Sequence, residues 1–281
     1  MTLKQGYKTC MGCMEPIVTK SVLEAIENPV VVSLATGCLE VASTSYPDSS
    51  WTCPTIHSAF GNSAATISGI ETAFNVLKRK GEIKENPKFI VIAGDGGTYD
   101  IGFQAMSGAF ERGHDFVYLC LDNGAYMNTG GQRSSASPYK SKTSTTPGGK
   151  VQWRKDLTKI ALAHNIPYVA QASVADLEDL KQKAKKAFET KGPAFLNVLV
   201  PCPRFWRYDL MNSKKINDLS FQTCFWPIFE VENGKKTVKV PENKIPVEEF
   251  LKIQGRFKNL TKEDIDEIQQ GVDKKWEELN N

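Results

Sequence analysis

The chain alternates short apolar runs with longer segments in which apolar residues recur every three or four positions. The apolar runs, rich in Val, Ile, Leu and Phe, cover residues 29–35, 88–94, 116–122, 167–170 and 194–200. Helical periodicity covers about 57–79, 100–112, 154–164 and 174–190. Repeated strand–helix–strand units predict an α/β fold, a parallel sheet with helices on both faces. A ligand of such a sheet binds at the carboxyl ends of the strands.

Two regions depart from this alternation. Residues 122–150 are a long polar stretch rich in Gly, Ser and Thr, and a loop of this length inside a domain is usually functional or disordered. Its position directly after a central strand favours function. Beyond Cys202 the alternation stops, and a charged helix is predicted from about Thr261, with Asp264 placed for a capping contact. We therefore expect a main domain over residues 1–225 and a C-terminal extension over 226–281 that packs on this domain or on a partner.

Charge and hydropathy exclude several classes of protein. The 281 residues include 35 Lys and Arg and 32 Asp and Glu, mixed along the whole chain, so no basic stripe marks a nucleic-acid surface. No run approaches the roughly 18 apolar residues that a membrane span needs, and the first ten residues contain no apolar signal segment. We expect a cytoplasmic protein that contacts neither nucleic acid nor membrane.

The run 88–94 ends in a glycine-rich turn that contains Asp95. Where a strand turns into a helix, the first amides of the helix point outward and bind anions such as diphosphate. Asp95 is itself negative, so a divalent cation between the carboxylate and the phosphate resolves the conflict, and Mg²⁺ takes oxygen ligands. The next strand ends at Asp122, and Asn123 lies 28 residues after Asp95. Because neighbouring parallel strands end side by side, we expect Asp95 and Asn123 to reach one ion.

These residues also carry a family resemblance. Residues 94–131 resemble the thiamin diphosphate motif, and the chain as a whole resembles the β subunit of the 2-oxoacid:ferredoxin oxidoreductases, pyruvate:ferredoxin oxidoreductase in particular. The resemblance is carried by ATGCLE (35–40), GDGGTYDIG (94–102), RGHD (112–115), YMNTGGQRS (126–134), PCPRFWR (201–207) and PVEEFLKIQGRF (246–257). Segments spread over nearly the whole length make the resemblance specific.

The resemblance implies a thiamin diphosphate-binding fold. It implies Mg²⁺ bound by Asp95, the Asn123 side chain and the Ala125 carbonyl, with Asn128 facing the thiazolium and the substrate. The expected cofactor-binding residues are Gly94, Asp95, Gly96, Gly97, Asn123, Ala125, Tyr126 and Asn128.

Seven cysteines, an odd number without a secretory signal, argue against a disulfide framework. Cys10 and Cys13 have CxxC spacing, Cys38 follows 25 residues later, and Cys202 comes after the last predicted strand. Four thiolates hold zinc or a 4Fe-4S cluster, but zinc sites usually pair two CxxC motifs. A thioredoxin-like motif is weaker still, because no strand precedes Cys10. The resemblance assigns the four residues to the 4Fe-4S cluster nearest the thiamin.

The other three cysteines are Cys53, Cys120 and Cys224. Cys120 lies inside an apolar strand and is expected to be a small buried hydrophobe, and Cys224, beside Phe225 and Trp226, is expected to pack in a core. Cys224 is the main alternative to Cys202 as fourth cluster ligand, and the PCPRFW segment favours Cys202. The role of Cys53 stays open.

Two further side chains are candidates for catalysis. His57, at the predicted start of the helix 57–79, follows a segment that the resemblance brings near the cofactor. Arg133, just after the thiamin motif, meets a substrate carboxylate or a phosphate, or is a solvated loop arginine. His114 and His164 lie at predicted helix ends, where surface or capping roles are expected.

The resemblance implies oxidative decarboxylation of a small 2-oxoacid, with pyruvate converted to acetyl-CoA and CO2 and electrons passed through 4Fe-4S clusters to ferredoxin. It implies α and γ partner subunits and a ferredoxin-like δ subunit or region, with the glutamate that activates thiamin on another chain. Coenzyme A takes part if the substrate is pyruvate. We expect partners or the cluster to cover the apolar surface around Trp51, Trp206 and Trp226.

Three alternatives remain at this point. An oxalate oxidoreductase, which belongs to the same family, would release CO2 without coenzyme A. A non-catalytic iron–sulfur electron-transfer subunit would not need the magnesium loops. A thiamin decarboxylase without redox function would not need four cysteines in these positions.

Overall fold

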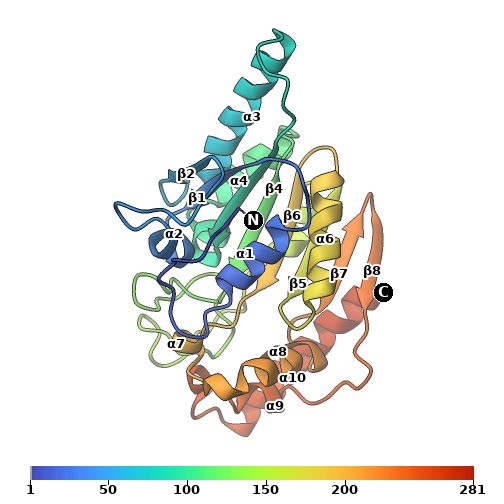
Figure 1. Ribbon diagram of the computed structural model, residues 1–281. Helices are drawn as coiled ribbons and strands as arrows, with labels where there is room; N and C mark the ends of the chain where they lie inside the picture. The colour runs from blue at the N-terminus through green and yellow to red at the C-terminus, as the bar shows by residue number, and fades with distance from the viewer. Residues whose placement is uncertain (1) are drawn as a thin grey trace.

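The computed structural model describes residues 2–281, and its centre is a single sheet of eight strands in the order β2-β1-β3-β4-β6-β5-β7-β8 (Figure 1). The strands are β1 (Val30–Ala35), β2 (Thr55–Ser58), β3 (Lys88–Gly94), β4 (Val117–Asp122), β5 (Tyr168–Ser173), β6 (Ala194–Leu199), β7 (Ile228–Glu232) and β8 (Lys235–Lys239). The first six strands in spatial order are parallel, which confirms the predicted α/β fold.

Helices cover both faces of this sheet. The α-helices are α1 (Glu15–Leu23), α2 (Cys38–Ser43), α3 (Ser63–Arg79), α4 (Phe103–Glu111), α5 (Leu157–Leu162), α6 (Leu177–Glu189), α7 (Pro203–Trp206), α8 (Ser213–Gln222), α9 (Glu248–Leu251) and α10 (Lys262–Asn280). A π-helical segment η1 (Gly96–Asp100) precedes α4, and short 3₁₀ segments η2 (Leu210–Asn212) and η3 (Gly255–Phe257) lie near the C-terminus. One apolar core joins α1 and α6 to the sheet, and a second joins α3, α4 and α5 to the other face.

The sheet continues beyond Cys202 with two antiparallel strands that the sequence analysis did not predict. β7 pairs with β5, and β8 pairs with β7. Asn233 and Gly234 turn the chain between them with φ angles of 48° and 82°, and this Asn-Gly turn favours a tight hairpin. The hairpin was missed because its strands are only five residues long and rich in charge.

The helix predicted from residue 57 begins at Ser63 instead. Residues 55–58 form β2, which pairs in parallel with β1 and places His57 opposite Leu34. The prediction failed because only four residues separate the short strand β2 from α3. The helical pattern of α3 was therefore read back into β2. The C-terminal helix is confirmed, with a capping box between Thr261 and Asp264.

A third apolar core lies in the C-terminal part and includes Trp206, Trp226 and Phe250. The Trp226 Nε1 atom donates to the Ala172 carbonyl at 2.7 Å, which ties this core to β5. Trp51, Trp206 and Trp226 are only 8, 1 and 2% exposed. The expectation that a partner or the cluster covers these rings was therefore wrong, because the chain buries them itself.

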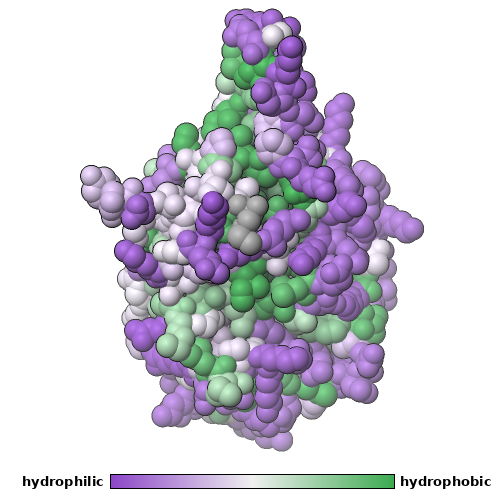
Figure 2. Space-filling view, viewed as in Figure 1, coloured by the Kyte–Doolittle hydropathy of each residue, from purple (hydrophilic) through white to green (hydrophobic). Residues whose placement is uncertain are grey.

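The apolar side chains that do reach solvent lie elsewhere. Met11, Val41 and Met211 are 82, 49 and 90% exposed. Figure 2 shows the face that carries α1 and α6, where hydrophilic side chains cover much of the surface and apolar patches lie between them. None of the helices in residues 2–281 combines the length and hydropathy that crossing a membrane requires.

Replacement of Phe250 by alanine tests whether the C-terminal extension unfolds together with the main domain. Phe250 is fully buried and contacts the Trp206 ring at 5.8 Å and the Phe225 ring at 4.7 Å between centroids. We expect Phe250→Ala to lower the free energy of unfolding by about 3–5 kcal/mol. Val240→Ala, at a position that is 65% exposed, should change it by less than about 0.5 kcal/mol.

The measurement is urea denaturation followed by both tryptophan fluorescence and far-UV circular dichroism. Both signals should change at one midpoint. Two separate transitions, with only the first shifted by Phe250→Ala, would show that residues 226–281 unfold on their own.

Candidate active site

The carboxyl ends of β3 and β4 lie side by side, with Gly94 opposite Leu121 in the register. Asp95 follows β3, and Asn123 follows β4. The Asn123 backbone N–H donates to Asp95 Oδ1 at 3.3 Å, so the two side chains start from the same point at this edge of the sheet. The structure thus brings together two residues that lie 28 positions apart in the sequence.

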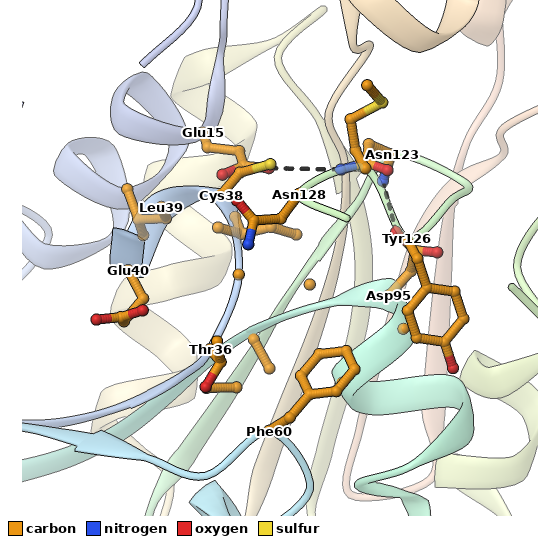
Figure 3. A pocket seen from close by; sticks show the side chains of 18 of the residues that line it. Glu15, Thr36, Cys38, Leu39, Glu40, Phe60, Asp95, Asn123, Tyr126 and Asn128 are labelled. Atoms are coloured by element: carbon orange, nitrogen blue, oxygen red, sulfur yellow. Dashed lines mark hydrogen bonds between the residues drawn. The ribbon is translucent and has the colours of Figure 1, made fainter. Parts of the chain in front are cut away.

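A cavity of about 150 Å³ opens at this edge, and Figure 3 shows the side chains around it. All eight residues that the sequence analysis assigned to cofactor binding line it: Gly94, Asp95, Gly96, Gly97, Asn123, Ala125, Tyr126 and Asn128. In Figure 3, Asp95 and Tyr126 lie on one side of the cavity, whereas Glu15, Cys38 and Asn128 lie toward the other. The far wall comes from α2 and the turn before it.

Two carboxylates are buried beneath the cavity, and they have different partners. Asp122 forms an ion pair with Arg154 at 2.5 Å and accepts a hydrogen bond from the Tyr99 hydroxyl at 2.7 Å. Asp95, 1% exposed, accepts hydrogen bonds from the Asn123 N–H and the Ser134 hydroxyl. Within residues 2–281 no side-chain cation forms an ion pair with Asp95. Burial, followed by repulsion from Asp122, raises the pKa of Asp95 well above its usual value.

The loop 122–150 closes over η1, and Lys150 holds it there. The Lys150 ammonium is 1% exposed and donates to the carbonyls of Ser135 at 3.1 Å and Ser137 at 2.7 Å. Asp100 in η1 accepts from the Ser135 N–H and from the Tyr126 hydroxyl, each at 3.0 Å. Burial lowers the pKa of Lys150 to about 8. The sequence analysis missed Lys150, although a lysine directly after two glycines was a visible signal.

The absence of a side chain at Gly96 makes room for the Tyr126 ring. A Cβ atom built at Gly96 would lie 2.5 Å from that ring, and one at Gly102 would lie 2.0 Å from the Gly97 carbonyl oxygen. The glycines of this motif therefore allow a close approach between η1 and the loop.

A second cavity, of about 340 Å³, adjoins the first, and Cys10, Cys13, Cys38 and Cys202 all line it. The two cavities share five wall residues: Glu15, Cys38, Asn123, Met127 and Asn128. In residues 2–281 no three His, Cys, Asp or Glu side chains converge closely enough to hold a single metal ion.

The four cysteines have unequal surroundings. Burial raises the pKa of Cys13 and Cys38 far above the ordinary value, and the nearby Glu15 carboxylate adds to the rise. The pKa of Cys202 rises only to about 11, because the backbone N–H groups of Phe205 and Arg204 donate to its sulfur and oppose the effect of burial. The pKa of Glu15 rises to about 7, mainly through burial.

The other three cysteines do not line either cavity. Cys120 is fully buried in β4, and Cys224 is 2% exposed in the C-terminal core. Cys53 is half-buried, with its sulfur 3.6 Å from the Thr55 hydroxyl.

The two candidate catalytic side chains lie outside both cavities. His57 Nε2 is 2.6 Å from the Thr36 hydroxyl, and its Nδ1 is 3.5 Å from Glu40 Oε1. Thr36 and Glu40 line the first cavity, so His57 supports its wall from outside. The Arg133 side chain is exposed, and its backbone N–H donates to the Thr145 hydroxyl at 3.0 Å.

Comparison with known proteins relates this geometry to a family. Residues 35–198 match the family described as thiamine pyrophosphate enzyme, C-terminal TPP binding domain. The chain is 46% identical to pyruvate synthase subunit PorB of Thermotoga maritima, over 99% of this chain and 90% of that protein. It is 47% identical to PorB of Methanocaldococcus jannaschii, over 96% and 93% of the two chains. The chain belongs to the thiamine pyrophosphate enzymes, in the family of the 2-oxoacid:ferredoxin oxidoreductase β subunits.

Other members of this family differ in the substrate that their names give. The chain is 43% identical to ketoisovalerate oxidoreductase subunit VorB of Pyrococcus horikoshii, over 98% of this chain and 91% of that protein. Among solved structures, a 2-oxoglutarate:ferredoxin oxidoreductase from Magnetococcus marinus has the same fold, with a TM-score of 0.63 at 22% identity over 77% of this chain and 78% of that one. The family binds thiamin diphosphate, and the cavity at Asp95 is the candidate site for it in this β subunit.

Replacement of Gly96 by alanine tests this cavity. The added Cβ would overlap the Tyr126 ring, and overpacking of this kind typically costs about 1–3 kcal/mol. We expect thiamin diphosphate to bind the assembled Gly96→Ala enzyme about tenfold more weakly or worse, as measured by calorimetric titration. Gly69→Ala in α3 is the control, because its Cβ would have no atom within 4 Å. Wild-type affinity in Gly96→Ala would place the cofactor elsewhere.

Proposed function

We propose that the chain is the β subunit of a pyruvate:ferredoxin-type oxidoreductase, which converts pyruvate to acetyl-CoA and CO2 and passes the electrons to ferredoxin. The observation that carries this proposal is the shared wall between the two cavities. Glu15, Cys38, Asn123, Met127 and Asn128 border both the diphosphate cavity and the cysteine cavity. A cofactor that generates electrons and a centre that accepts them would then be neighbours.

The oxygen atoms at the diphosphate end fit a magnesium ion. Asp95 offers a carboxylate, Asn123 an amide oxygen and Ala125 a backbone carbonyl, and all three residues are at most 5% exposed. Mg²⁺ prefers such hard ligands and is often bound by one or two carboxylates together with substrate phosphates. Asp95 has no side-chain cation among residues 2–281, so the ion would supply the positive charge that a buried carboxylate requires. These three residues are the proposed magnesium ligands.

The donor set of the second cavity fits a 4Fe-4S cluster. Cys10, Cys13, Cys38 and Cys202 are all free thiols that reach one cavity, and four thiolates are the usual ligands of such a cluster. Cys224 lies in the C-terminal core, which favours Cys202 as the fourth ligand. Zinc would require the four sulfurs to converge on one ion, and no such group occurs in the described part of the chain.

Thiamin diphosphate, when bound, supplies the carbanion chemistry of decarboxylation, and an iron–sulfur cluster accepts single electrons. The residues of this chain hold and orient these groups. Asp95, Asn123 and the Ala125 carbonyl would fix the diphosphate end through Mg²⁺. Asn128 lies at the boundary of the two cavities and is the residue proposed to face the thiazolium and the substrate. His57 would act only by supporting Thr36.

Pyruvate is the proposed substrate because both PorB relatives are named for pyruvate synthase. A ketoisovalerate enzyme at 43% identity shows that similar β subunits serve a bulkier 2-oxoacid. The names of these relatives give no support to oxalate. An electron-transfer subunit without catalysis would have no use for the oxygen ligands around Asp95, so that alternative is also less well supported.

The relatives are named as subunits of larger enzymes, and we propose α, γ and ferredoxin-like δ partners for this chain. The α-type partner would bring the glutamate that activates thiamin. Met11 and Val41 lie next to cysteine ligands or on the cavity wall and are exposed, which supports a partner that covers the cysteine cavity. Seven free thiols suit a reducing compartment, and we propose the cytoplasm.

The ligand set is tested by two cysteine substitutions in the reconstituted chain. Cys202→Ser should lose the cluster, with a fall in iron content and in charge-transfer absorption, because an alcohol replaces a thiolate ligand. Cys224→Ser is the matched control and should keep both signals. Loss of iron in Cys224→Ser alone would make Cys224 the ligand.

The activity is tested on the purified complex with pyruvate, ketoisovalerate, 2-oxoglutarate and oxalate, with a viologen dye as acceptor. Pyruvate should give the highest kcat/KM, with CO2 release and dye reduction that both require coenzyme A and Mg²⁺. The isolated chain, supplied with thiamin diphosphate, Mg²⁺ and an intact cluster, should show no turnover, because the activating glutamate is expected on a partner. Oxalate turnover without coenzyme A, or turnover by the lone chain, would contradict the proposal.

A further inference from the structure

A buried arginine without a countercharge lies in the C-terminal extension. Arg256 is 1% exposed, and its Nε donates to Gln254 Oε1 at 2.8 Å. Both terminal nitrogens of its guanidinium are buried and have no hydrogen-bond partner, and no carboxylate in residues 2–281 forms an ion pair with it. Burial lowers the pKa of Arg256, but a guanidinium starts from so high a value that it keeps its proton at neutral pH. Buried charges in proteins are normally paired, but the carboxylates that act on Arg256, Asp122 and Asp95, form no ion pair with it.

The guanidinium lies behind the two turns that border the cysteine cavity. Its central carbon stacks 3.7 Å from the centre of the Trp206 ring, and Trp206 ends the helix α7 that begins after Cys202. The Trp206 Nε1 donates to the Asn123 carbonyl at 2.7 Å. A Cβ built at Gly124 would lie 3.2 Å from an Arg256 nitrogen. The positive charge therefore faces both the Cys202 turn and the loop that follows β4.

The charges around the cysteine cavity are asymmetric. The Glu15 carboxylate is buried and lines the cavity itself. Arg256 lies behind the Cys202 turn, because it stacks on Trp206, whose backbone N–H donates to the Cys202 carbonyl at 2.8 Å. Arg154 is also near, but its charge is neutralised by Asp122. Arg256 is thus a buried cation on the Cys202 side that forms no ion pair within residues 2–281, whereas Arg204 on the same turn is exposed.

We propose that Arg256 is the buried countercharge of the iron–sulfur cluster and raises its reduction potential. This inference rests on the proposed function, because it requires the cluster to be bound by the four cysteines. Reduction adds one electron and one unit of negative charge to the cluster, and the electron comes from oxidation of the 2-oxoacid. Charge, hydrogen bonds to the sulfurs and solvent exposure set the potential of such clusters. A fixed positive charge, shielded from water, makes the added electron more favourable.

A purely structural role predicts the opposite stability change. An unpaired buried charge is costly, so we expect its replacement by an apolar side chain of similar length to be neutral or stabilising. In the chain without a cluster, Arg256→Met should therefore be at least as stable as the wild type. A residue retained only for its packing on Trp206 would lose stability on the same substitution.

The experiment uses the full chain with its cluster reconstituted under anaerobic conditions. The variants are Arg256→Met and Arg256→Gln, which remove the charge, and Arg256→Lys, which keeps it. Arg204→Met is the matched control, because Arg204 lies on the same turn beside Cys202 but its side chain is exposed and screened by water. Each variant is measured for iron and sulfide content, for midpoint potential by spectroelectrochemical titration, and for thermal stability without the cluster.

With iron content unchanged, Arg256→Met and Arg256→Gln should shift the reduction equilibrium about tenfold toward the oxidised cluster, which is about 59 mV for one electron. Arg256→Lys should retain most of the wild-type potential, and Arg204→Met should shift it by less than a third of this amount. If Arg256→Met disturbs the stacking on Trp206 and the chain loses iron, the midpoint potential of Arg256→Gln tests the same loss of charge.

Three results would overturn the inference. An unchanged potential in both neutral variants with full iron content would leave the cluster in place and exclude Arg256 as its countercharge. An equal shift in Arg204→Met would show that burial is irrelevant. A wild-type chain that binds no cluster would refute the proposed ligand set itself, and the inference would fall with it.

Discussion

Two carboxylates are buried side by side at the ends of β3 and β4, and only one of them has a cation. Asp122 is neutralised by Arg154, whereas Asp95 accepts from the Ser134 hydroxyl and one backbone N–H and pairs with no cation among the described residues. Bringing like charges together out of water is unfavourable, so this edge of the sheet favours a bound positive ion, which we propose is Mg²⁺. The loop 122–150 packs against this edge: the Ser134 hydroxyl donates to Asp95, and the Lys150 ammonium donates to two carbonyls of the loop.

The sequence predicted those parts of the structure in which a short local pattern of residues is compatible with only one kind of secondary structure or contact. Five apolar runs became β1, β3, β4, β5 and β6, because a strand buried on both faces must be apolar throughout. The proximity of Asp95 and Asn123 could also be predicted, since neighbouring parallel strands end at the same edge of the sheet. The capping box at Thr261 and Asp264 needed only the spacing of two residues.

The rest depends on contacts between distant segments. β2 is four residues long and becomes a strand only because β1 offers it hydrogen bonds. The approach of Cys10 to Cys202 depends on how the N-terminal segment crosses the sheet edge, and spacing alone does not encode it; the family resemblance supplied that grouping. The burial of Trp206 and Trp226 required the C-terminal core, which no periodicity revealed. Arg256, buried in the same core, was likewise invisible in the sequence.

The hairpin of β7 and β8 determines how this sheet ends. Without it, β5 would present an unpaired row of backbone groups to other chains, a template for aggregation. In the hairpin, β7 pairs with β5, and β8 becomes the edge strand of the sheet. The five residues of β8 include Lys235, Lys236 and Lys239. A short, lysine-rich border resists further strand addition, because incoming strands would meet repulsion and strongly hydrated side chains. The lysine-rich edge thus disfavours strand pairing between copies of this chain at this end of the sheet.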